Sequence, residues 1–168
     1  MKKIEMTETY QASADKVFNS LDDLSIAGMH MTNTSMPMMG GKMNLEFLTL
    51  ARKGLHTSYR WTGKVLWMLL DFTIVVTRWI KGREKTWETV TPAKMIIYAW
   101  FRMDLKVMES NHQSTAHLSI SYEKPKETIN RILSFLFADW YCRWCLKNML
   151  NDAANKLRNE GNKTMKIV

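Results

Sequence analysis

The stretch that decides the fold lies near the C-terminus, at residues 127–159, and reads ETINRILSFLFADWYCRWCLKNMLNDAANKLRN. Apolar residues recur there every three to four positions, which is the period of an amphipathic helix. One stripe of this helix consists of Ile129, Leu133, Leu136, Trp140 and Trp144. Pro125 precedes the stretch and Gly161 follows it, so we expect one long helix that ends at the glycine. Such a helix spans a whole small domain.

The part of the chain before this helix, from residue 42 to residue 122, shows the alternation typical of β-strands. Turn-forming residues interrupt the alternation and separate the segments. Strands are predicted near residues 43–50, 56–66, 69–80, 83–91, 94–109 and 112–123. In the segment 94–109 the apolar face carries Phe101 and Met103, and the opposite face carries Tyr98, Trp100 and Arg102.

The N-terminal part begins with an alternating segment at residues 3–11, which predicts a half-buried strand. A helix follows, because Ser13 can cap it and Asp15 suits the positive end of its dipole. A second short helix or turn is expected at 24–30, before a loop rich in Met and Gly that extends to Gly41. A wide apolar sheet face needs a cover, and only the C-terminal helix is long enough to provide it.

This order of elements resembles the SRPBCC superfamily, which includes START lipid-transfer domains, the birch pollen allergen group and polyketide cyclase/dehydrase-like proteins. The similarity rests also on YQASADKVF at 10–18 and YRWTGKV at 59–65, and it covers nearly the whole chain. It implies an α+β helix-grip fold. In that fold a curved antiparallel sheet of about seven strands wraps around a long C-terminal helix, and two short helices follow the first strand. It also implies a deep apolar cavity between the sheet and that helix.

Composition agrees with one globular domain over residues 1–168, because 46% of the residues are hydrophobic and 24% are charged. The chain contains 14 Met, 7 Trp, 5 Tyr and 6 Phe, which favours either a bulky core or an apolar cavity. In the first case the aromatic residues only pack the core. In the second case they line a ligand site, for which the candidates are Tyr59, Trp61, Trp87, Tyr98, Trp100, Trp140 and Trp144.

Together with this composition, the resemblance implies that the ligand is a small hydrophobic or amphipathic molecule such as a lipid, a quinone or a polyketide-like compound. Burying ~300 Å² of apolar ligand surface contributes about 7 kcal/mol before the costs of association, which leaves roughly micromolar to millimolar binding. Met36 and Met39 belong to the Met-rich loop, where flexible thioethers suit the mouth of a cavity. Thioethers with His30 would also suit Cu(I), but no export signal supports a copper protein, so no metal and no cofactor are expected.

An enzyme of the cyclase/dehydrase kind is the alternative function. Polar groups that might converge on a cavity are His30, His56, Asp71, Tyr98, Arg102, Asp104 and His117. No two of them are brought together by their spacing, so no catalytic residue is assigned. A third alternative is an interaction module, in which an exposed part of the long helix forms a homodimer.

The net charge of +8 is spread along the chain, with a dense cluster at Arg78, Lys81, Arg83 and Lys85 around one predicted turn. We interpret this cluster as a solvated face that could attract an anionic head group or membrane surface. No nucleic-acid-binding motif accompanies the charge, so nucleic acid is not expected as a partner.

The compartment expected from the sequence is the cytoplasm. Acidic residues interrupt the N-terminus where a signal peptide needs an apolar stretch, and the apolar run at 65–76 is too short to span a bilayer. Cys142 and Cys145 are expected to be reduced, semi-buried thiols on one face of the long helix.

Overall fold

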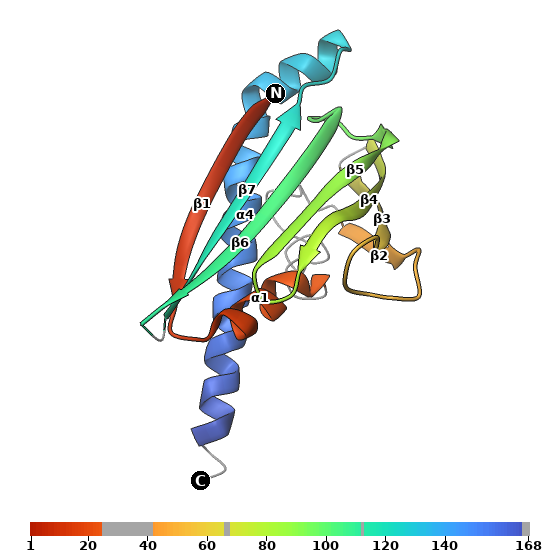
Figure 1. The fold of residues 1–168 in the computed structure, drawn as a ribbon. Helices are drawn as coiled ribbons and strands as arrows, with labels where there is room; N and C mark the ends of the chain where they lie inside the picture. Colours follow the sequence, from red (N-terminus) through yellow and green to blue (C-terminus); the bar gives the residue numbers. More distant parts are fainter. Residues whose placement is uncertain (25–41, 66–67, 112, 166–168) are drawn as a thin grey trace.

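A computed structural model describes residues 1–24, 42–65, 68–111 and 113–165, and seven strands of this part form one antiparallel sheet (Figure 1). The order of the strands is β1-β7-β6-β5-β4-β3-β2. Their bounds are Lys2–Tyr10 for β1, Lys42–Phe47 for β2, Ser58–Val65 for β3, Met68–Ile80 for β4, Glu84–Lys94 for β5, Trp100–Ser110 for β6 and Gln113–Glu123 for β7. Helix α1 spans Ala14–Asp22 and helix α4 spans Thr128–Met165.

This architecture confirms the predicted helix-grip fold, with a curved sheet of seven strands and one long C-terminal helix. Helix α4 continues through Gly161 to Met165, so the expectation that the glycine ends the helix is wrong. The second short helix expected at 24–30 lies almost wholly outside the described residues, as does the loop that follows it.

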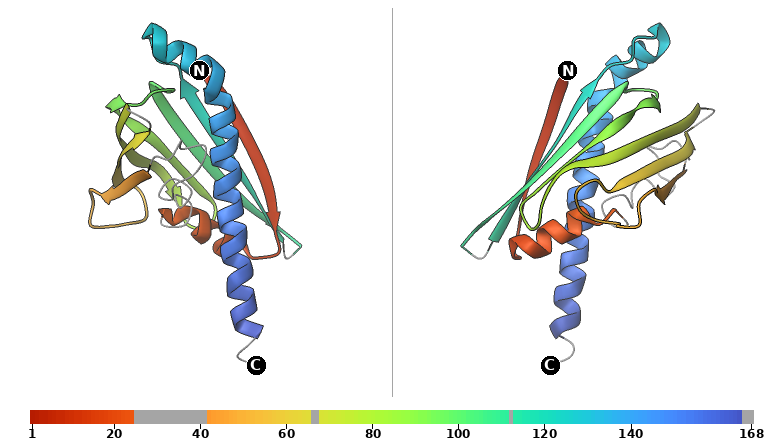
Figure 2. Two further views of the ribbon diagram at one scale, coloured as in Figure 1. Left: turned by 180° about the vertical axis from the view of Figure 1, so that it is seen from behind. Right: turned by 45° about the vertical axis from the view of Figure 1, so that its right-hand side comes forward.

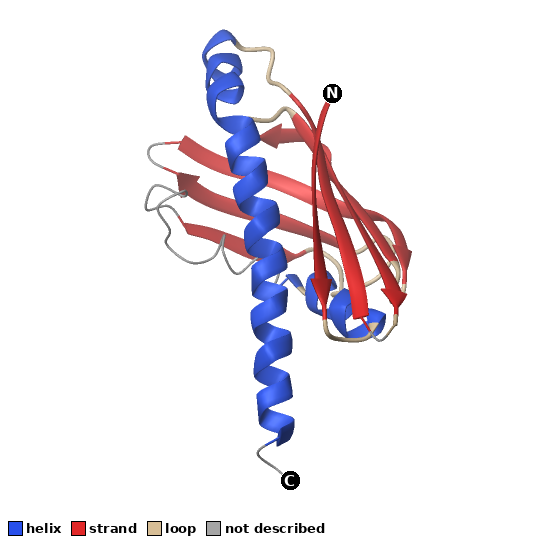
Figure 3. Ribbon diagram, turned by 90° about the vertical axis from the view of Figure 1, so that its left-hand side faces the viewer, coloured by secondary structure: helices blue, strands red, loops and turns tan. Residues whose placement is uncertain are grey.

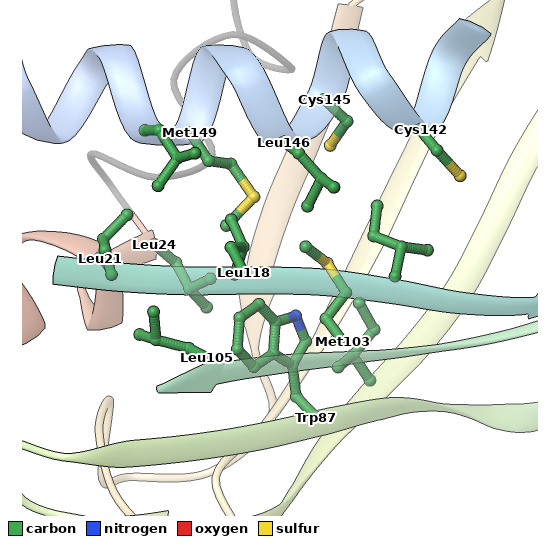
Figure 4. Close-up of a cluster of buried hydrophobic side chains, with 14 of the residues drawn as sticks. Leu21, Leu24, Trp87, Met103, Leu105, Leu118, Cys142, Cys145, Leu146 and Met149 are labelled. Carbon is green, nitrogen blue, oxygen red and sulfur yellow. The ribbon is translucent and has the colours of Figure 1, made fainter. Parts of the chain in front are cut away.

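The sheet has one apolar face and one polar face because alternate residues of each strand point to opposite sides. In β6 the buried residues are Met103, Leu105 and Val107, whereas Arg102 and Lys106 on the opposite face are exposed. The apolar face, which we call the inner face, is turned toward α4. Side chains of α4 such as Leu146 and Met149 meet those of the inner strands in the core (Figure 4).

Helix α4 does not cover the sheet evenly. It packs most extensively against β1, β7 and α1. In Figure 2, β1 lies close beside α4, whereas β2, β3 and β4 lie toward the far edge of the sheet. Figure 3 shows the strong twist of the sheet around the helix. The inner face of β3 to β5 is therefore the part of the sheet least closely packed by α4.

The strand predicted at 94–109 divides into two parts. Strand β5 runs to Lys94, β6 begins at Trp100, and residues 95–99 form a connection between them. Tyr98 in this connection is buried, with its ring 5.0 Å from that of Tyr122. Its hydroxyl donates to the carbonyl oxygen of Ala138 in α4 at 3.3 Å. These contacts with the helix outweigh the local alternation that predicted a continuous strand.

Helix α1 begins after Ser13, as predicted, but the serine side chain makes no capping hydrogen bond. The carboxylate of Glu109 instead accepts a hydrogen bond from the backbone N–H of Ala14 at 2.8 Å, which places a negative charge at the start of the helix. Val17, Phe18 and Leu21 form the buried side of α1. This packing positions the last residue of α1, Asp22, against the inner face of the sheet.

Candidate functional site

A cluster of buried polar groups lies where the C-terminal end of α1 meets the inner face of β3 to β5. Asp22 is the last residue of α1, Thr57 directly precedes β3, Tyr59 lies in β3, and Lys85 lies in β5. All four residues are buried, with no more than 3% of their surface exposed. We call these residues the inner polar cluster.

The charged half of the inner polar cluster is an ion pair. The Nζ atom of Lys85 lies 2.7 Å from Oδ1 of Asp22 and donates to the backbone oxygen of the same residue at 3.1 Å. The indole N–H of Trp79 donates to the other carboxylate oxygen of Asp22 at 3.2 Å. Lys85 also lies 5.0 Å from the ring centroid of Trp87, where a cation is attracted by the aromatic face. Each charge is thus balanced within the protein.

The hydroxyl half of the cluster is not satisfied in the same way. Among the described residues, the buried hydroxyls of Tyr59 and Thr57 have no hydrogen-bond partner. Both residues share the inner face with Trp61, because alternate residues of β3 point to the same side. A buried hydroxyl without a partner lowers stability by about 1–3 kcal/mol. Two such hydroxyls in one cluster therefore require an explanation.

Burial changes the acid–base properties of this cluster. The pKa of the Tyr59 phenol is well above its ordinary value because the ring is desolvated and the carboxylate of Asp22 is near. The phenol therefore remains a neutral donor. Desolvation lowers the pKa of Lys85, and the charge of Asp22 opposes that effect. Neutral hydroxyl donors beside a compensated ion pair suit the binding of a ligand oxygen that accepts a hydrogen bond.

A second group of aromatic residues lies beneath α4 and has a different character. Tyr98 is surrounded by Tyr122, Tyr141 and Phe101, with ring centroids between 5.0 and 6.3 Å apart. Its hydroxyl is shared between the backbone oxygen of Ala138 and the thiol of Cys142. This tyrosine is a fully bonded core residue that ties the β5–β6 connection to the helix.

The predicted ligand-binding residues separate into three groups. Tyr59, Trp61 and Trp87 come together on the inner face of β3 to β5. Tyr98 and Trp144 lie in or beside the aromatic group under α4. Trp100 lies on the outer face with Arg102, and Trp140 is 52% exposed, so neither joins the inner face. Met36 and Met39 lie outside the described residues.

The polar residues considered for catalysis do not converge. Arg60 binds Asp71 through two hydrogen bonds of 2.7 and 2.6 Å on the outer face. Arg102 and Asp104 pair on β6, and His117 contacts Thr7 across β7 and β1. His56 is exposed at the end of a loop, and His30 lies outside the described residues.

The outer face of the sheet holds a groove of about 820 Å³ between β1 and β4. Its walls are polar, and most of their charges are paired within the protein. Lys3 pairs with Glu5, Arg78 with Glu84, and Arg102 with Asp104. A groove whose charges neutralise one another offers a ligand little that solvent does not already provide.

The sequence interpretation missed Asp22 and Lys85. It assigned Lys85 to a solvated basic cluster, but this side chain is only 3% exposed, so that assignment is wrong. The strand alternation contained the signal, since Lys85 shares its face with Trp87 and Thr89, both of which are buried. Asp22 carried no comparable signal, because its partner is 63 residues away.

The two thiols are free and buried, as expected for their helix face. Burial raises the pKa of the Cys142 thiol to about 12, so it is not a reactive thiolate.

The part of the chain that the structure describes contains no group of three or more His, Cys, Asp or Glu residues able to hold a metal ion. No helix among the described residues is long and apolar enough to cross a membrane.

Comparison with solved structures finds the same fold in several proteins. The Zhui aromatase/cyclase from Streptomyces sp. R1128 has a TM-score of 0.67 at 15% identity, over 95% of this chain and 98% of that one. Ara h 8.0201 has a TM-score of 0.61 at 10% identity, over 92% and 98%. Norcoclaurine synthase from Thalictrum flavum, solved in complex with dopamine and hydroxybenzaldehyde, has a TM-score of 0.64 at 14% identity, over 94% and 87%.

No protein-family model matches the sequence, and no curated protein matches it. At identities of 10–15% the structural likeness establishes the fold. It confirms the helix-grip fold that the order of elements predicted.

Proposed function

We propose that this helix-grip protein binds a small amphipathic molecule on the inner face of β3 to β5, with an acceptor oxygen of the ligand bonded to Tyr59. The observation that carries the proposal is the Tyr59 hydroxyl, which is wholly buried and has no partner among the described residues. A carbonyl or hydroxyl oxygen on a ligand would satisfy it. Trp61 and Trp87 supply flat apolar surface beside it.

The fold supports this proposal independently. Norcoclaurine synthase, which shares the fold, has been solved with the small aromatic molecules dopamine and hydroxybenzaldehyde. Aromatic side chains such as Trp61 and Trp87 on the inner face offer flat apolar surface on which ligands of that kind can stack. A quinone or a polyketide-like compound combines such a ring with carbonyl oxygens, so these two ligand classes fit better than a simple hydrocarbon chain.

An enzymatic role of the cyclase/dehydrase kind is the second candidate, and the Lys85–Asp22 pair is the observation that favours it. The pair places an ammonium and a carboxylate next to a neutral phenol inside the protein. Proton transfer, however, requires a group that is free to change its charge. In this pair each ion stabilises the charged form of the other. Binding is therefore the function that the geometry supports best.

The binding proposal can be tested with two probes of the same shape. 2,3-Dimethyl-1,4-naphthoquinone carries two carbonyl oxygens and has blocked positions that do not add thiols, whereas 2,3-dimethylnaphthalene has the same carbon frame without oxygen. Quenching of the tryptophan fluorescence reports the affinity for each probe. We expect the quinone to bind more tightly, by roughly tenfold for one hydrogen bond of about 1.4 kcal/mol.

The matched variants are Tyr59→Phe and Tyr10→Phe. In Tyr59→Phe the preference for the quinone should disappear, while the stability of the ligand-free protein should hold or rise, since an unpaired hydroxyl is removed. Tyr10 donates to the backbone oxygen of Leu150 at 3.0 Å, so Tyr10→Phe should reduce stability and leave the preference unchanged. The proposal fails if neither probe binds, or if Tyr59→Phe retains the full preference.

A further inference from the structure

The first turns of α4 expose large apolar side chains in unusual density. Figure 1 shows these turns standing clear of the strands at the end of the sheet where β7 leads into the helix. Six residues within twelve positions keep between 48% and 75% of their surface exposed. We call them the α4 ridge, which consists of Ile129, Ile132, Phe135, Leu136, Phe137 and Trp140.

The size of the α4 ridge separates it from ordinary surface hydrophobic residues. An aromatic side chain presents about 150–250 Å², so the three aromatic members, half to three-quarters exposed, already contribute roughly 200–500 Å², and the three aliphatic members add to it. Exposed leucines also occur at Leu48, Leu50 and Leu55 in the loop between β2 and β3, but they are half as many and include no aromatic side chain. A contiguous apolar surface of this extent marks a contact site.

Exposed basic residues outnumber exposed acidic ones by three to two in the segment around the ridge. Lys124 and Lys126 lie in the connection from β7 to α4, and Arg131 lies within the ridge itself, all three exposed. The ammonium of Lys124 is 5.0 Å from the ring centroid of Phe135, so charge and apolar surface are in direct contact. Glu123 and Glu127 are the exposed acidic residues of the same segment.

The same end of the sheet adds further positive charge. Lys64 and Lys94 lie at the ends of β3 and β5 and are exposed. Leu69, which pairs with Lys64 across the β3–β4 hairpin, exposes another apolar side chain there. Asp139 does not offset this charge, because it is paired with Lys2.

We propose that the α4 ridge docks this protein onto the surface of an anionic lipid bilayer. Apolar side chains on a projecting helix enter the boundary between head groups and acyl chains, while the neighbouring lysine and arginine side chains reach the phosphates. Trp140 suits this boundary, since indole has an apolar body and a polar N–H. A second copy of the chain fits less well, because it would bring two positively charged surfaces together. This inference does not depend on the ligand proposed above.

Vesicle flotation tests the proposal on the full chain. The vesicles contain phosphatidylcholine alone or phosphatidylcholine mixed with phosphatidylserine. We expect the protein to float only with the phosphatidylserine vesicles, and we expect added salt to weaken the binding. Absence of flotation with those vesicles would overturn the proposal.

Two pairs of variants separate the apolar and basic contributions. Phe135→Ser combined with Leu136→Ser should reduce vesicle affinity by about tenfold or more, and so should Lys124→Gln combined with Arg131→Gln. The matched controls are Leu48→Ser combined with Leu50→Ser, and Lys81→Gln combined with Lys106→Gln, which change exposed residues elsewhere and should leave the affinity unchanged.

Equal losses in the control variants would show non-specific adsorption and would refute docking through the ridge. Light scattering on the free protein measures its mass and so tests the alternative that a second copy of the chain covers the ridge. A dimer that Phe135→Ser with Leu136→Ser dissociates would show that a second copy covers the ridge, and the membrane proposal would then be wrong.

Discussion

Replacing Lys85 by methionine tests whether the inner polar cluster depends on a buried ion pair. The substitution preserves much of the side-chain volume and removes only the charge opposite Asp22. Asp22 is 1% exposed, so its carboxylate would remain buried with the indole N–H of Trp79 as its remaining side-chain donor. Breaking a buried pair from one side costs about 3–5 kcal/mol, and we expect a loss in that range near pH 7.

The loss should depend on pH in a defined direction. A buried carboxylate left without its cation takes up a proton more readily than a paired one. Protonation removes the buried charge, so the difference in stability between the wild type and Lys85→Met should shrink as the pH falls toward 4. A purely steric effect of the substitution would not change with pH.

Urea unfolding followed by tryptophan fluorescence measures these differences in the free energy of unfolding. The informative comparison adds Asp22→Leu and the double variant with both substitutions. The double variant should recover most of the loss, because two apolar residues replace a pair whose attraction only balances its desolvation. Asp71→Leu, which breaks the exposed pair with Arg60, is the control and should change stability far less. A loss below about 1 kcal/mol in Lys85→Met, or additive effects in the double variant, would refute the reasoning.

Two further predictions concern pH and backbone conformation. All five tyrosines have a pKa above the ordinary value of 10.0, chiefly because they are desolvated. The unfolded chain therefore releases these protons first, and stability should be complete below pH 10 and fall as the pH rises beyond it. Absorbance of tyrosinate at alkaline pH should appear together with the loss of circular dichroism; ionisation well before unfolding would contradict the burial of these rings. Gly82 has a φ of 74° in the β4–β5 turn, and a Cβ there would meet the carboxylate of Asp15. Gly82→Ala should cost about 1–3 kcal/mol in thermal or urea unfolding, and adding Asp15→Ala should restore only part of it, since the strained φ remains. Full recovery in that double variant would show that φ contributes nothing.

Much of the fold was predictable from local patterns. The alternation in β6 and β7 placed Met103, Leu105 and Leu118 on one face, and the helical period of residues 127–159 predicted the long helix α4. Each of these signals acts over a few residues, and burial on one side of an element reinforces it. The long helix was therefore the most secure part of the prediction.

The errors arose where contacts over long sequence separations dominate. Tyr98 lies outside the strands, contrary to the alternation, because its hydroxyl bonds to α4 at a residue 40 positions later. Lys85 is buried, contrary to the expectation for a lysine, because its charge is neutralised by Asp22, which lies 63 residues earlier. Ile129, Leu136 and Trp140 belong to the predicted apolar stripe of α4 but are exposed. The helix instead turns Ala138, Cys142 and Leu146 toward the sheet. A pattern identifies the apolar stripe, but only the tertiary structure shows how much of it is covered.

The contrast between Tyr98 and Tyr59 separates a core residue from a candidate binding residue more sharply than composition does. Both phenols are buried on the same side of the sheet and both have a raised pKa. The hydroxyl of Tyr98 has two protein partners, whereas that of Tyr59 has none among the described residues. A phenylalanine at position 59 would fill the same space without the energetic cost of an unpaired hydroxyl. Natural proteins retain such local costs mainly where function requires them, and this is why the inner polar cluster, rather than the aromatic group under α4, is the place to look for the ligand.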